Sequence, residues 1–351
     1  MRLFTSSIHA LALAAVACAH TTIWSVWVNG VDQSSGVGIR LPAYNDPPLP
    51  ANPAKGQSAG YNNSPVQDLT SIDLRCNVLG DVQNPHTVPV HPGDIVTLEW
   101  HHNWRNTSDD IIATSHLGPS SIYLSPDPPT NNSWVKIQEE GLSADGTWYT
   151  GQKLNMRQGK QDLQIPSGIA PGFYLLRSDL IALHQAEISR LTNKNFGAQV
   201  YVGCVQLEVL GSGTTTLPVG VGFPGAYGYN DPGILYNIYN TPLPPYTVPG
   251  PTVWSGAAPS PTPPVYGSPS GYTTAPNWST WIGSGFQTAT LQTSVTVVTG
   301  TETVTQTYVP AWSSAYKTPA PTAFDATRTS FEREFTTVSP SAAMAVPTNG
   351  V

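Results

Sequence analysis

Short segments in which apolar and polar residues alternate recur along the first two thirds of the chain. Because successive side chains of a β-strand point to opposite faces, this spacing predicts strands. Long connections rich in Pro, Gly and Asn separate the segments. We expect the strands at Thr22–Val28, Ile72–Cys76, Ile95–Trp100, Ser121–Leu124, Trp134–Gln138, Phe173–Leu176 and Gln199–Val209.

Helical periodicity is weak in the same region, and only Leu180–Ile188 has the spacing of a short helix. The strand pattern therefore predicts an all-β fold for residues 20–255. We expect an immunoglobulin-like or fibronectin-like antiparallel β-sandwich with long decorated loops.

The first 19 residues have the pattern of a secretory signal peptide. Arg2 is followed by an apolar stretch to Val16 and then by Ala17-Cys18-Ala19, which fits a signal-peptidase cleavage site. The stretch is too short for a membrane anchor. A buried first strand of a cytosolic domain would not require this order of features. We therefore expect a secreted, extracellular protein whose mature form begins at His20, with no membrane partner.

From residue 256 to residue 351 the chain is dominated by Ser, Thr and Pro. This composition cannot bury much apolar surface, so it predicts a disordered, O-glycosylated C-terminal tail. Within it, Ser294–Val309 alternates Thr with Val, which favours extended or local β-structure.

Charge and cysteine content narrow the possible functions. The net charge is −7, which gives no basic surface for nucleic acid. Removal of the signal would remove Cys18 and leave Cys76 and Cys204, for which one disulfide is expected in an oxidising compartment and two buried thiols are the alternative. Sequons at Asn106, Asn131 and Asn277 are compatible with secretion.

A free N-terminal histidine has unusual metal chemistry. The α-amine has a pKa of about 7.7–8.0, so a metal ion readily displaces its proton. The amine and Nδ1 of the same imidazole can close a six-membered chelate ring, and one further imidazole completes a T-shaped set of three nitrogens. Such donors favour Cu(II). His20 therefore predicts a copper site if cleavage follows Ala19.

Spacing alone does not identify the third nitrogen. His116 lies in a turn with Gly and Pro that would hold an imidazole rigidly. A loop histidine is nonetheless more often solvated than metal-bound, and a strand histidine is more often a surface or core residue. The mature chain offers His86, His91, His101, His102, His116 and His184.

A set of ordered motifs resembles the fungal lytic polysaccharide monooxygenases of auxiliary activity family nine. The resemblance covers nearly all of residues 20–255. Besides His20, it rests on Ser115-His116-Leu117-Gly118-Pro119, Ile165-Pro166, Pro171-Gly172-Phe173-Tyr174-Leu175-Leu176-Arg177, Ile181-Ala182-Leu183-His184, Gly197-Ala198-Gln199-Val200-Tyr201, Cys204 and Val248-Pro249-Gly250-Pro251.

The resemblance implies roles for individual residues. His20 and His116 would bind one copper ion as a histidine brace, and Tyr201 would approach its axial position. His184 and Gln199 would form hydrogen bonds to oxygen species beside the copper. Gln199 and Tyr201 are two residues apart on a predicted strand and would point to one face. Cys76 and Cys204 would form the family's disulfide.

The implied substrate is cellulose or a related β-glucan, cleaved oxidatively at C1 or C4. The implied co-substrates are O₂ or H₂O₂ and an external reductant, either a small molecule or a cellobiose dehydrogenase-type enzyme. Tyr246 resembles a surface tyrosine that stacks on sugar rings, although it could instead be a half-buried loop anchor, as could Tyr44, Tyr61, Tyr236 and Tyr239. Asp179 departs from the family pattern, which usually has glutamate there. We expect a monomer.

Two other functions remain open from the sequence. A secreted copper-binding or cell-wall-associated protein without catalysis would fit the Ser/Thr-rich tail, but it would not need Tyr201, Gln199 and His184. A hydrolytic glycosidase would need two carboxylates beside the scissile bond, and no such pair stands out.

Overall fold

The structure is a computed structural model that describes residues 20–42, 63–103, 105 and 107–268. Of the chain after residue 268 it describes the backbone of four short strands. The predicted signal peptide, Tyr44, Tyr61, Asn106 and Asn277 lie outside the described residues. Among the described residues, Asn131 is exposed and no helix is long and apolar enough to cross a membrane.

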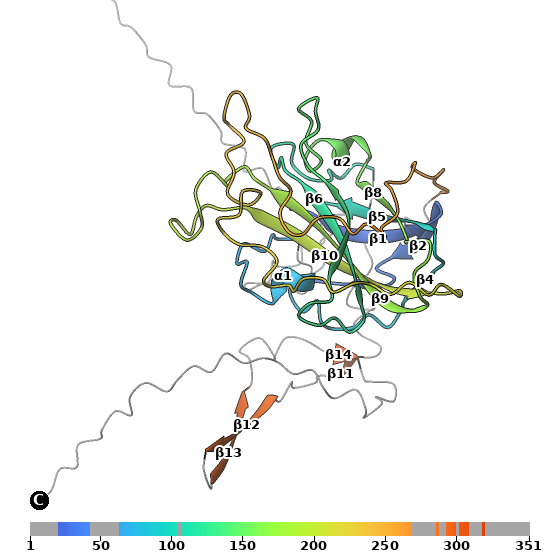
Figure 1. Ribbon diagram of the computed structural model, residues 1–351, viewed down its shortest axis with the longest axis vertical. Helices are drawn as coiled ribbons and strands as arrows, with labels where there is room; N and C mark the ends of the chain where they lie inside the picture. Colours follow the sequence, from blue (N-terminus) through green and yellow to red (C-terminus); the bar gives the residue numbers. More distant parts are fainter. Residues whose placement is uncertain are drawn as a thin grey trace, which may run out of the picture. The chain divides into compact units, whose positions relative to one another are not determined.

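Two β-sheets form the body of the protein (Figure 1). Sheet A is antiparallel, and its strands follow the order β2 (Val31–Ser35), β1 (Thr22–Val28), β5 (Ile95–His101) and β8 (Lys160–Gln164). Sheet B has the order β3 (Ile39–Arg40), β10 (Gln199–Val209), β9 (Gly172–Ala182), β6 (Ser120–Pro126) and β7 (Val135–Glu140). A further strand, β4 (Val88–Val90), pairs parallel to β10. The predicted all-β sandwich is confirmed.

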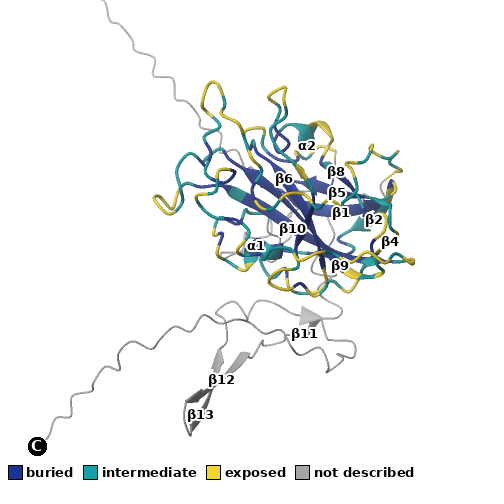
Figure 2. Ribbon diagram, viewed as in Figure 1, coloured by how far each residue is buried: buried dark blue, intermediate teal, exposed yellow. Residues whose placement is uncertain are grey.

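The main core lies between the two sheets, with Val26, Leu98 and Leu163 from sheet A and Leu176 and Leu207 from sheet B. A second core covers the other face of sheet B, because long loops pack against it. Figure 2 shows the resulting pattern of buried strands and exposed loop tips. Sheet B is thus buried on both faces, which explains why the 11-residue strands β9 and β10 are almost continuously buried.

The second core accounts for two wrong predictions. Ile72–Cys76 was expected to be a strand but contains the one-turn helix α1 (Asp73–Cys76), which directs Leu74 and Cys76 into the second core. Leu180–Ile188 was expected to be a helix, but its first residues extend β9 and the rest form turns. The other described helix, α2 (Lys153–Met156), is also one turn long.

The predicted disulfide is confirmed between Cys76 and Cys204. It joins α1 to the middle of β10 across 128 residues of sequence. Cys204 belongs to the second core, whereas Tyr201 belongs to the core between the sheets. These two β10 residues therefore point to opposite faces of sheet B.

Residues 254–268, here called the C-terminal strap, pack on the sandwich. The Trp254 amide donates to the Lys136 carbonyl at 2.8 Å, and the Gly267 amide donates to the Gly30 carbonyl at 2.9 Å. The Tyr266 ring meets Trp27 edge-on, with 5.6 Å between the ring centroids. The ordered domain thus extends past the predicted boundary at residue 255.

The chain divides into two compact units, residues 1–278 and 279–351. In the second unit, β12 (Thr293–Thr299) and β13 (Glu302–Tyr308) form an antiparallel hairpin, as the Thr/Val alternation favoured. A short pair joins β11 (Phe286–Gln287) to β14 (Thr318–Pro319). The remainder of the predicted tail after residue 268 lies outside the described residues.

Candidate metal centre

His20 lies next to the N-terminal end of β1, which is an inner strand of sheet A. β1 is antiparallel to β5, with Thr22 opposite His101. The Thr21 amide donates to the Asn63 carbonyl at 3.2 Å, and the Thr21 hydroxyl donates to the His101 carbonyl at 3.3 Å. The residue after His20 is thus tied to two other segments, which fixes the start of β1 against the end of β5.

His116 lies in a turn that runs beside the end of β9. The Leu183 amide donates to the Leu117 carbonyl at 2.9 Å. This bond brings together their chain neighbours, His184 and His116. The ring centroids of His116 and His184 are 4.0 Å apart and the planes differ by 29°. These two histidines, 68 positions apart in sequence, therefore form one stacked pair.

Gly118 permits this close approach. A Cβ atom at Gly118 would lie 1.9 Å from the carbonyl oxygen of Ile181 on β9. Any side chain there would push the His116 turn away from β9, which gives the glycine of the Leu117-Gly118-Pro119 segment a physical reason.

Tyr201 and Gln199 project from the start of β10 toward the histidine pair. The Tyr201 ring centroid is 5.9 Å from that of His116. The Tyr201 hydroxyl donates to Oε1 of Gln199 at 3.0 Å. Tyr201 is buried whereas Gln199 is half-buried. Four of the predicted site residues therefore lie together at the end of the sandwich where β1 begins.

Burial holds the site histidines in the neutral form. It lowers the pKa of His116 to about 3, with further contributions from the charges of His184, His20 and His102. Burial, followed by the charge of His102, also lowers the pKa of His20. Burial lowers the pKa of His184, against a smaller opposing effect of Glu187.

This donor set fits a copper ion. Neutral imidazoles present nitrogen lone pairs at neutral pH, and nitrogen donors favour Cu(II). The charge of His20 contributes to the lowered pKa of His116, and His20 also stacks near His102, so His20 and His116 lie at the same end of the domain. The buried phenol of Tyr201 adds an oxygen beside them.

Three of the other histidines are separated from this centre by their surroundings. His86 and His91 are exposed in loops, and His91 lies 3.7 Å from a carboxylate oxygen of Asp94. His101 is buried, with Nε2 2.9 Å from Oε1 of Glu99. The alternatives that spacing left open are thus reduced by geometry.

His102 is a neighbour of His20 that the sequence did not single out. The two rings are nearly parallel, at 14°, with centroids 6.4 Å apart. Nδ1 of His102 is 2.7 Å from Oδ1 of Asp110, and ligand atoms of His102, Asp109 and Asp110 lie within 4.8 Å of one another. Asp109 also accepts the amide of Asn103 at 2.6 Å. These contacts close the loop after β5, and the only sequence signal was the His-His pair at a strand end.

The family model of Auxiliary Activity family 9, formerly GH61, matches residues 20–246. The chain belongs to this family. The match begins at His20 and includes His116, His184, Gln199 and Tyr201.

Named relatives support the assignment to Auxiliary Activity family 9. The chain is 44% identical over 254 residues to AA9 family lytic polysaccharide monooxygenase A of Aspergillus fumigatus, covering 71% of this chain and 66% of that protein. It is 42% identical to the protein of the same name from Aspergillus niger, covering 74% of this chain and 58% of the relative. The chain thus spans less than two thirds of the length of these two relatives.

Solved structures of similar proteins also support the assignment to this family. CvAA9A is 36% identical and superposes with a TM-score of 0.60, covering 68% of this chain and all of CvAA9A. The extended catalytic domain of H. jecorina LPMO9A is 27% identical with a TM-score of 0.52, covering 73% of this chain and all of that domain.

Tyr246 does not have the surroundings of the predicted stacking residue. It is half-buried, its hydroxyl donates to the Gly233 carbonyl at 2.7 Å, and its ring packs edge-on against Trp148 and Tyr236 with centroid distances of 4.7 and 4.9 Å. These contacts are those of a loop anchor, which was the alternative considered for this residue.

Tyr239 has the surroundings that were expected for Tyr246. Its side chain is 64% exposed. Its hydroxyl donates at 2.9 Å to the backbone carbonyl of His184, which places the exposed ring beside the histidine pair. The sequence had named Tyr239 only as one of several loop tyrosines.

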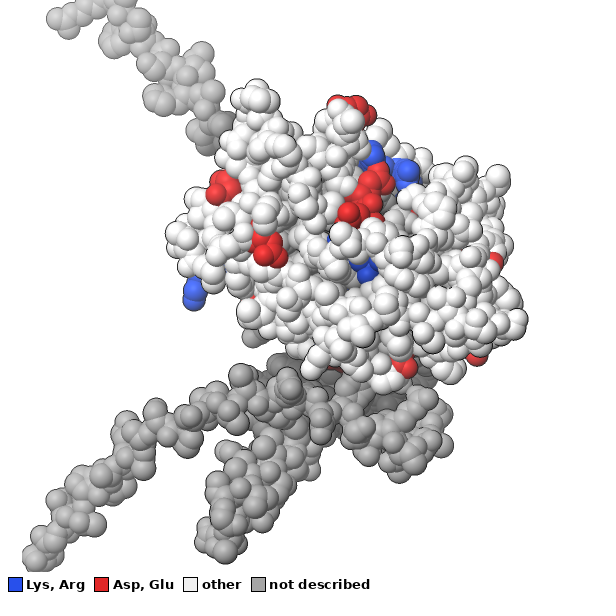
Figure 3. Space-filling view, viewed as in Figure 1, with Lys and Arg blue, Asp and Glu red and all other residues white. Residues whose placement is uncertain are grey.

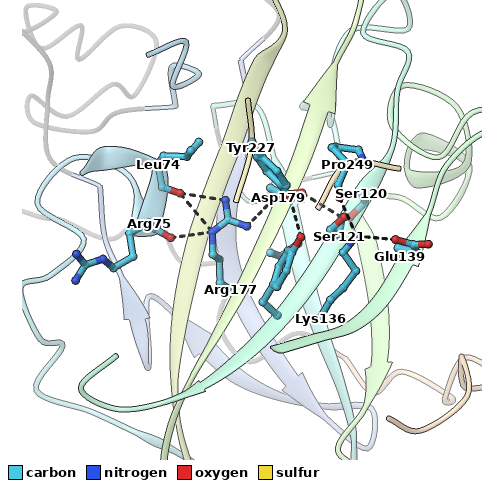
Figure 4. A network of polar contacts seen from close by, with 12 residues as sticks. Leu74, Arg75, Ser120, Ser121, Lys136, Glu139, Arg177, Asp179, Tyr227 and Pro249 are labelled. Carbon is cyan, nitrogen blue, oxygen red and sulfur yellow. Dashed lines mark hydrogen bonds and ion pairs between the residues drawn. The ribbon is translucent and has the colours of Figure 1, made fainter. Parts of the chain in front are cut away.

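Asp179, which departs from the family pattern, lies in a buried network on sheet B (Figure 4). It forms an ion pair with Arg177, and it accepts hydrogen bonds from Tyr227 at 2.7 Å and from the Ser121 amide at 3.1 Å. The Arg177 guanidinium lies 3.7 Å from the centroid of Phe223. The shorter acidic residue is therefore fully engaged, on a face of the sheet away from Tyr201.

Proposed function

We propose that the mature chain is a secreted, monomeric, copper-dependent lytic polysaccharide monooxygenase that cleaves the β-1,4-glucan chains of cellulose oxidatively at C1, C4 or both. The stacked His116 and His184 rings, with Tyr201 and Gln199 beside them and His20 at the same end of the sandwich, carry this proposal. Family membership and the names of the relatives support it.

His20 and His116 would hold the copper ion. Removal of residues 1–19 would free the α-amine of His20, which would add a third nitrogen to the two imidazoles, and the Tyr201 phenol would lie beside them. Bound copper, reduced by a small molecule or a cellobiose dehydrogenase-type enzyme, would supply the activation of O₂ or H₂O₂. The hydroxylated sugar would then lose its glycosidic bond by elimination.

The other site residues would transfer protons and form hydrogen bonds beside the copper ligands. The neutral imidazole of His184 can hold or deliver a proton next to the stacked ring of His116. Burial raises the pKa of Tyr201, so its phenol keeps its proton and donates a hydrogen bond to Oε1 of Gln199. The N–H groups of Gln199 lie at the other end of the amide from this bond.

Substrate contact involves an uncharged surface with an exposed aromatic ring. Tyr239 offers such a ring beside His184, and sugar rings present apolar C–H faces to it. Charged residues make up only 11% of the chain, which suits a neutral polysaccharide better than a polyanion. On the face drawn in Figure 3, acidic and basic side chains gather in one group and the others lie apart from one another. In this proposal Tyr246 anchors its loop by packing against Trp148 and does not contact the substrate.

The decisive experiment compares two forms of the copper-loaded protein, one beginning at His20 and one retaining Ala19. Each is incubated with amorphous cellulose, ascorbate and H₂O₂, and the products are analysed by mass spectrometry. We expect aldonic or C4-keto oligosaccharides from the His20 form alone. The variant His116→Ala controls for free copper.

Stoichiometric copper binding without oxidised products from any of several β-glucans would instead indicate the non-catalytic copper-binding or cell-wall protein. N-terminal sequencing of the secreted protein that began elsewhere than at His20 would reject the copper site itself.

A further inference from the structure

The amide group of Gln199 is held from both ends. Its Oε1 accepts the Tyr201 hydroxyl at 3.0 Å, and its Nε2 donates to Oε1 of Gln185 at 3.0 Å. Tyr201 can either donate or accept, so it alone does not decide which end of the amide faces it. In the orientation found, Gln185 presents Oε1 to Gln199, and because this oxygen can only accept, it pairs with the NH₂ end of Gln199.

Gln185 is placed by the turn that follows β9. The Ala186 amide donates to the Leu183 carbonyl at 3.0 Å, which turns the chain directly after His184. The Gly197 amide then donates to the Gln185 carbonyl at 2.7 Å and closes the base of the loop between them. This backbone bond brings the half-buried side chain of Gln185 against Gln199, two residues past Gly197.

We propose that Gln185 is a positioning residue, which fixes the amide of Gln199 in one of its two orientations; this inference rests on the function proposed above. In the orientation found, one N–H of Gln199 donates to Gln185, and the second N–H of the same NH₂ group remains as a further donor. A flip of the amide would exchange the carbonyl oxygen and the NH₂ group. Gln199 would then present an acceptor where it now presents a donor.

The side chain and the backbone of Gln185 have different functions in this proposal. The loop closure uses the Gln185 carbonyl and the Gly197 amide, which a change of side chain leaves in place. A purely structural role of the side chain would therefore act on the stability of the loop, whereas a positioning role acts on the Gln199 amide and on the rate of oxidation.

The test compares Gln185→Leu, which removes the acceptor at similar size, with Gln185→Glu, which retains an acceptor. Gln164→Leu is the matched control, because Gln164 donates to the Gly93 carbonyl at 2.9 Å near the start of β5, away from the histidine end. The first measurement uses copper-free, ¹⁵N-labelled protein. The side-chain amide resonances of Gln199 report the hydrogen bonds of its NH₂ group.

We expect Gln185→Leu to shift the Gln199 amide resonances and to speed exchange of their protons, while Gln185→Glu and Gln164→Leu retain protected protons. In copper-loaded protein, we expect Gln185→Leu to lower the rate of H₂O₂-driven cellulose oxidation about tenfold, the size of one lost hydrogen bond. Cu(II) affinity should stay within about threefold, since no donor nitrogen is changed. Gln185→Glu should recover most of the rate.

Unchanged Gln199 amide resonances in Gln185→Leu would overturn the positioning role, as would a wild-type oxidation rate in that variant. A loss of rate that Gln185→Glu does not recover would also count against it. Wild-type protein that binds copper but oxidises no glucan would overturn the proposed function, and the amide measurement, made without copper, would still report the orientation of Gln199.

Discussion

Two tyrosines show how the surroundings of a residue decide its use. Tyr246 and Tyr239 both follow Pro- or Asn-rich loop segments, and their sequences do not distinguish them. Tyr246 has its hydroxyl bonded to Gly233 and its ring wedged between other aromatic rings. Tyr239 has only its hydroxyl anchored, so its ring faces solvent beside His184. Burial distinguishes an anchor from a contact surface.

These surroundings predict opposite effects of truncation. We expect Tyr246→Ala to lower the free energy of unfolding by about 3 kcal/mol, because it removes a packed aromatic ring and a buried hydrogen bond. Tyr239→Ala should change stability by less than about 0.5 kcal/mol and weaken cellulose binding several-fold. Urea unfolding and pull-down on cellulose measure the two effects. Equal effects of both substitutions on binding would contradict the assignment.

At the scale of elements, a buried charge cluster ties β1, β5 and β8 together on sheet A. Glu99 of β5 is 1% exposed. Its carboxylate accepts hydrogen bonds from Trp27 at 2.6 Å, from Arg105 at 2.8 Å and from His101 at 2.9 Å, and Lys160 lies at 3.8 Å. Because His101 ends β5 opposite Thr22, this cluster also supports the segment that carries His20 in the candidate metal centre.

The cluster predicts a pH-dependent stability. Burial alone would raise the pKa of Glu99, but the hydrogen bonds from His101 and Arg105 and the charges of Arg105 and Lys160 hold it well below its usual range. A folded-state pKa below the unfolded value means that the stabilisation is complete above about pH 4.5 and is lost as the pH falls further. We expect Glu99→Gln to cost about 3 kcal/mol at pH 7 and clearly less at pH 3.

Urea unfolding at pH 7, 5 and 3 measures this difference. Glu208→Gln, on the half-buried side of β10, is the control and should give a small difference at each pH. A penalty for Glu99→Gln that stays constant from pH 7 to pH 3 would contradict the role of the carboxylate charge.

Strands with one clear pattern could be predicted from the sequence. β1 and β10 have the predicted bounds, and β5 is one residue longer than predicted. The alternation rule failed where charged residues are buried within a strand. β9 was expected to be only four residues long, because its charged Arg177 and Asp179 interrupt the apolar pattern, although they pair with each other inside the second core.

The site was predictable only in part, for a related physical reason. The chelating chemistry of an N-terminal histidine follows from the sequence, but His116 was selected from six histidines only through family motifs. Contacts made by chain folding, such as those of His102 with His20 and of Gln185 with Gln199, have no periodic signal. Separations of 82 and 14 residues are set by loops whose course the sequence pattern does not determine.

At the scale of the whole molecule, the C-terminal strap extends the domain past the boundary that composition suggested. Composition changes near residue 256, but Tyr266 still bonds to Asp162 and meets Trp27 edge-on. A Cβ atom at Gly30 would lie 2.1 Å from the Val265 carbonyl oxygen, which shows how closely the strap is applied. A Pro-rich segment can therefore belong to a domain if a few aromatic contacts hold it.

The strap predicts that the position of the C-terminus affects stability. A mature chain that ends at Ser268 should unfold at the same urea concentration as the full-length mature chain. One that ends at Ser255 should be less stable by about 2 kcal/mol, because it loses the Tyr266 ring contact and hydrogen bonds. Equal urea midpoints for the two shortened chains would show that the strap contributes nothing.

The course of β1 gives the strap a practical consequence. His20 precedes one end of this strand, and Gly30, which bonds to Gly267 of the strap, follows the other end. Seven extended residues span about 23 Å, so a chain leaving after residue 268 starts at the pole of the domain opposite the histidines. A domain attached to an electrode, a bead or a sensor chip through a linker at residue 268 should thus keep its histidine pole toward the solution, whereas coupling through a free amine of His20 would consume a nitrogen of the proposed copper site.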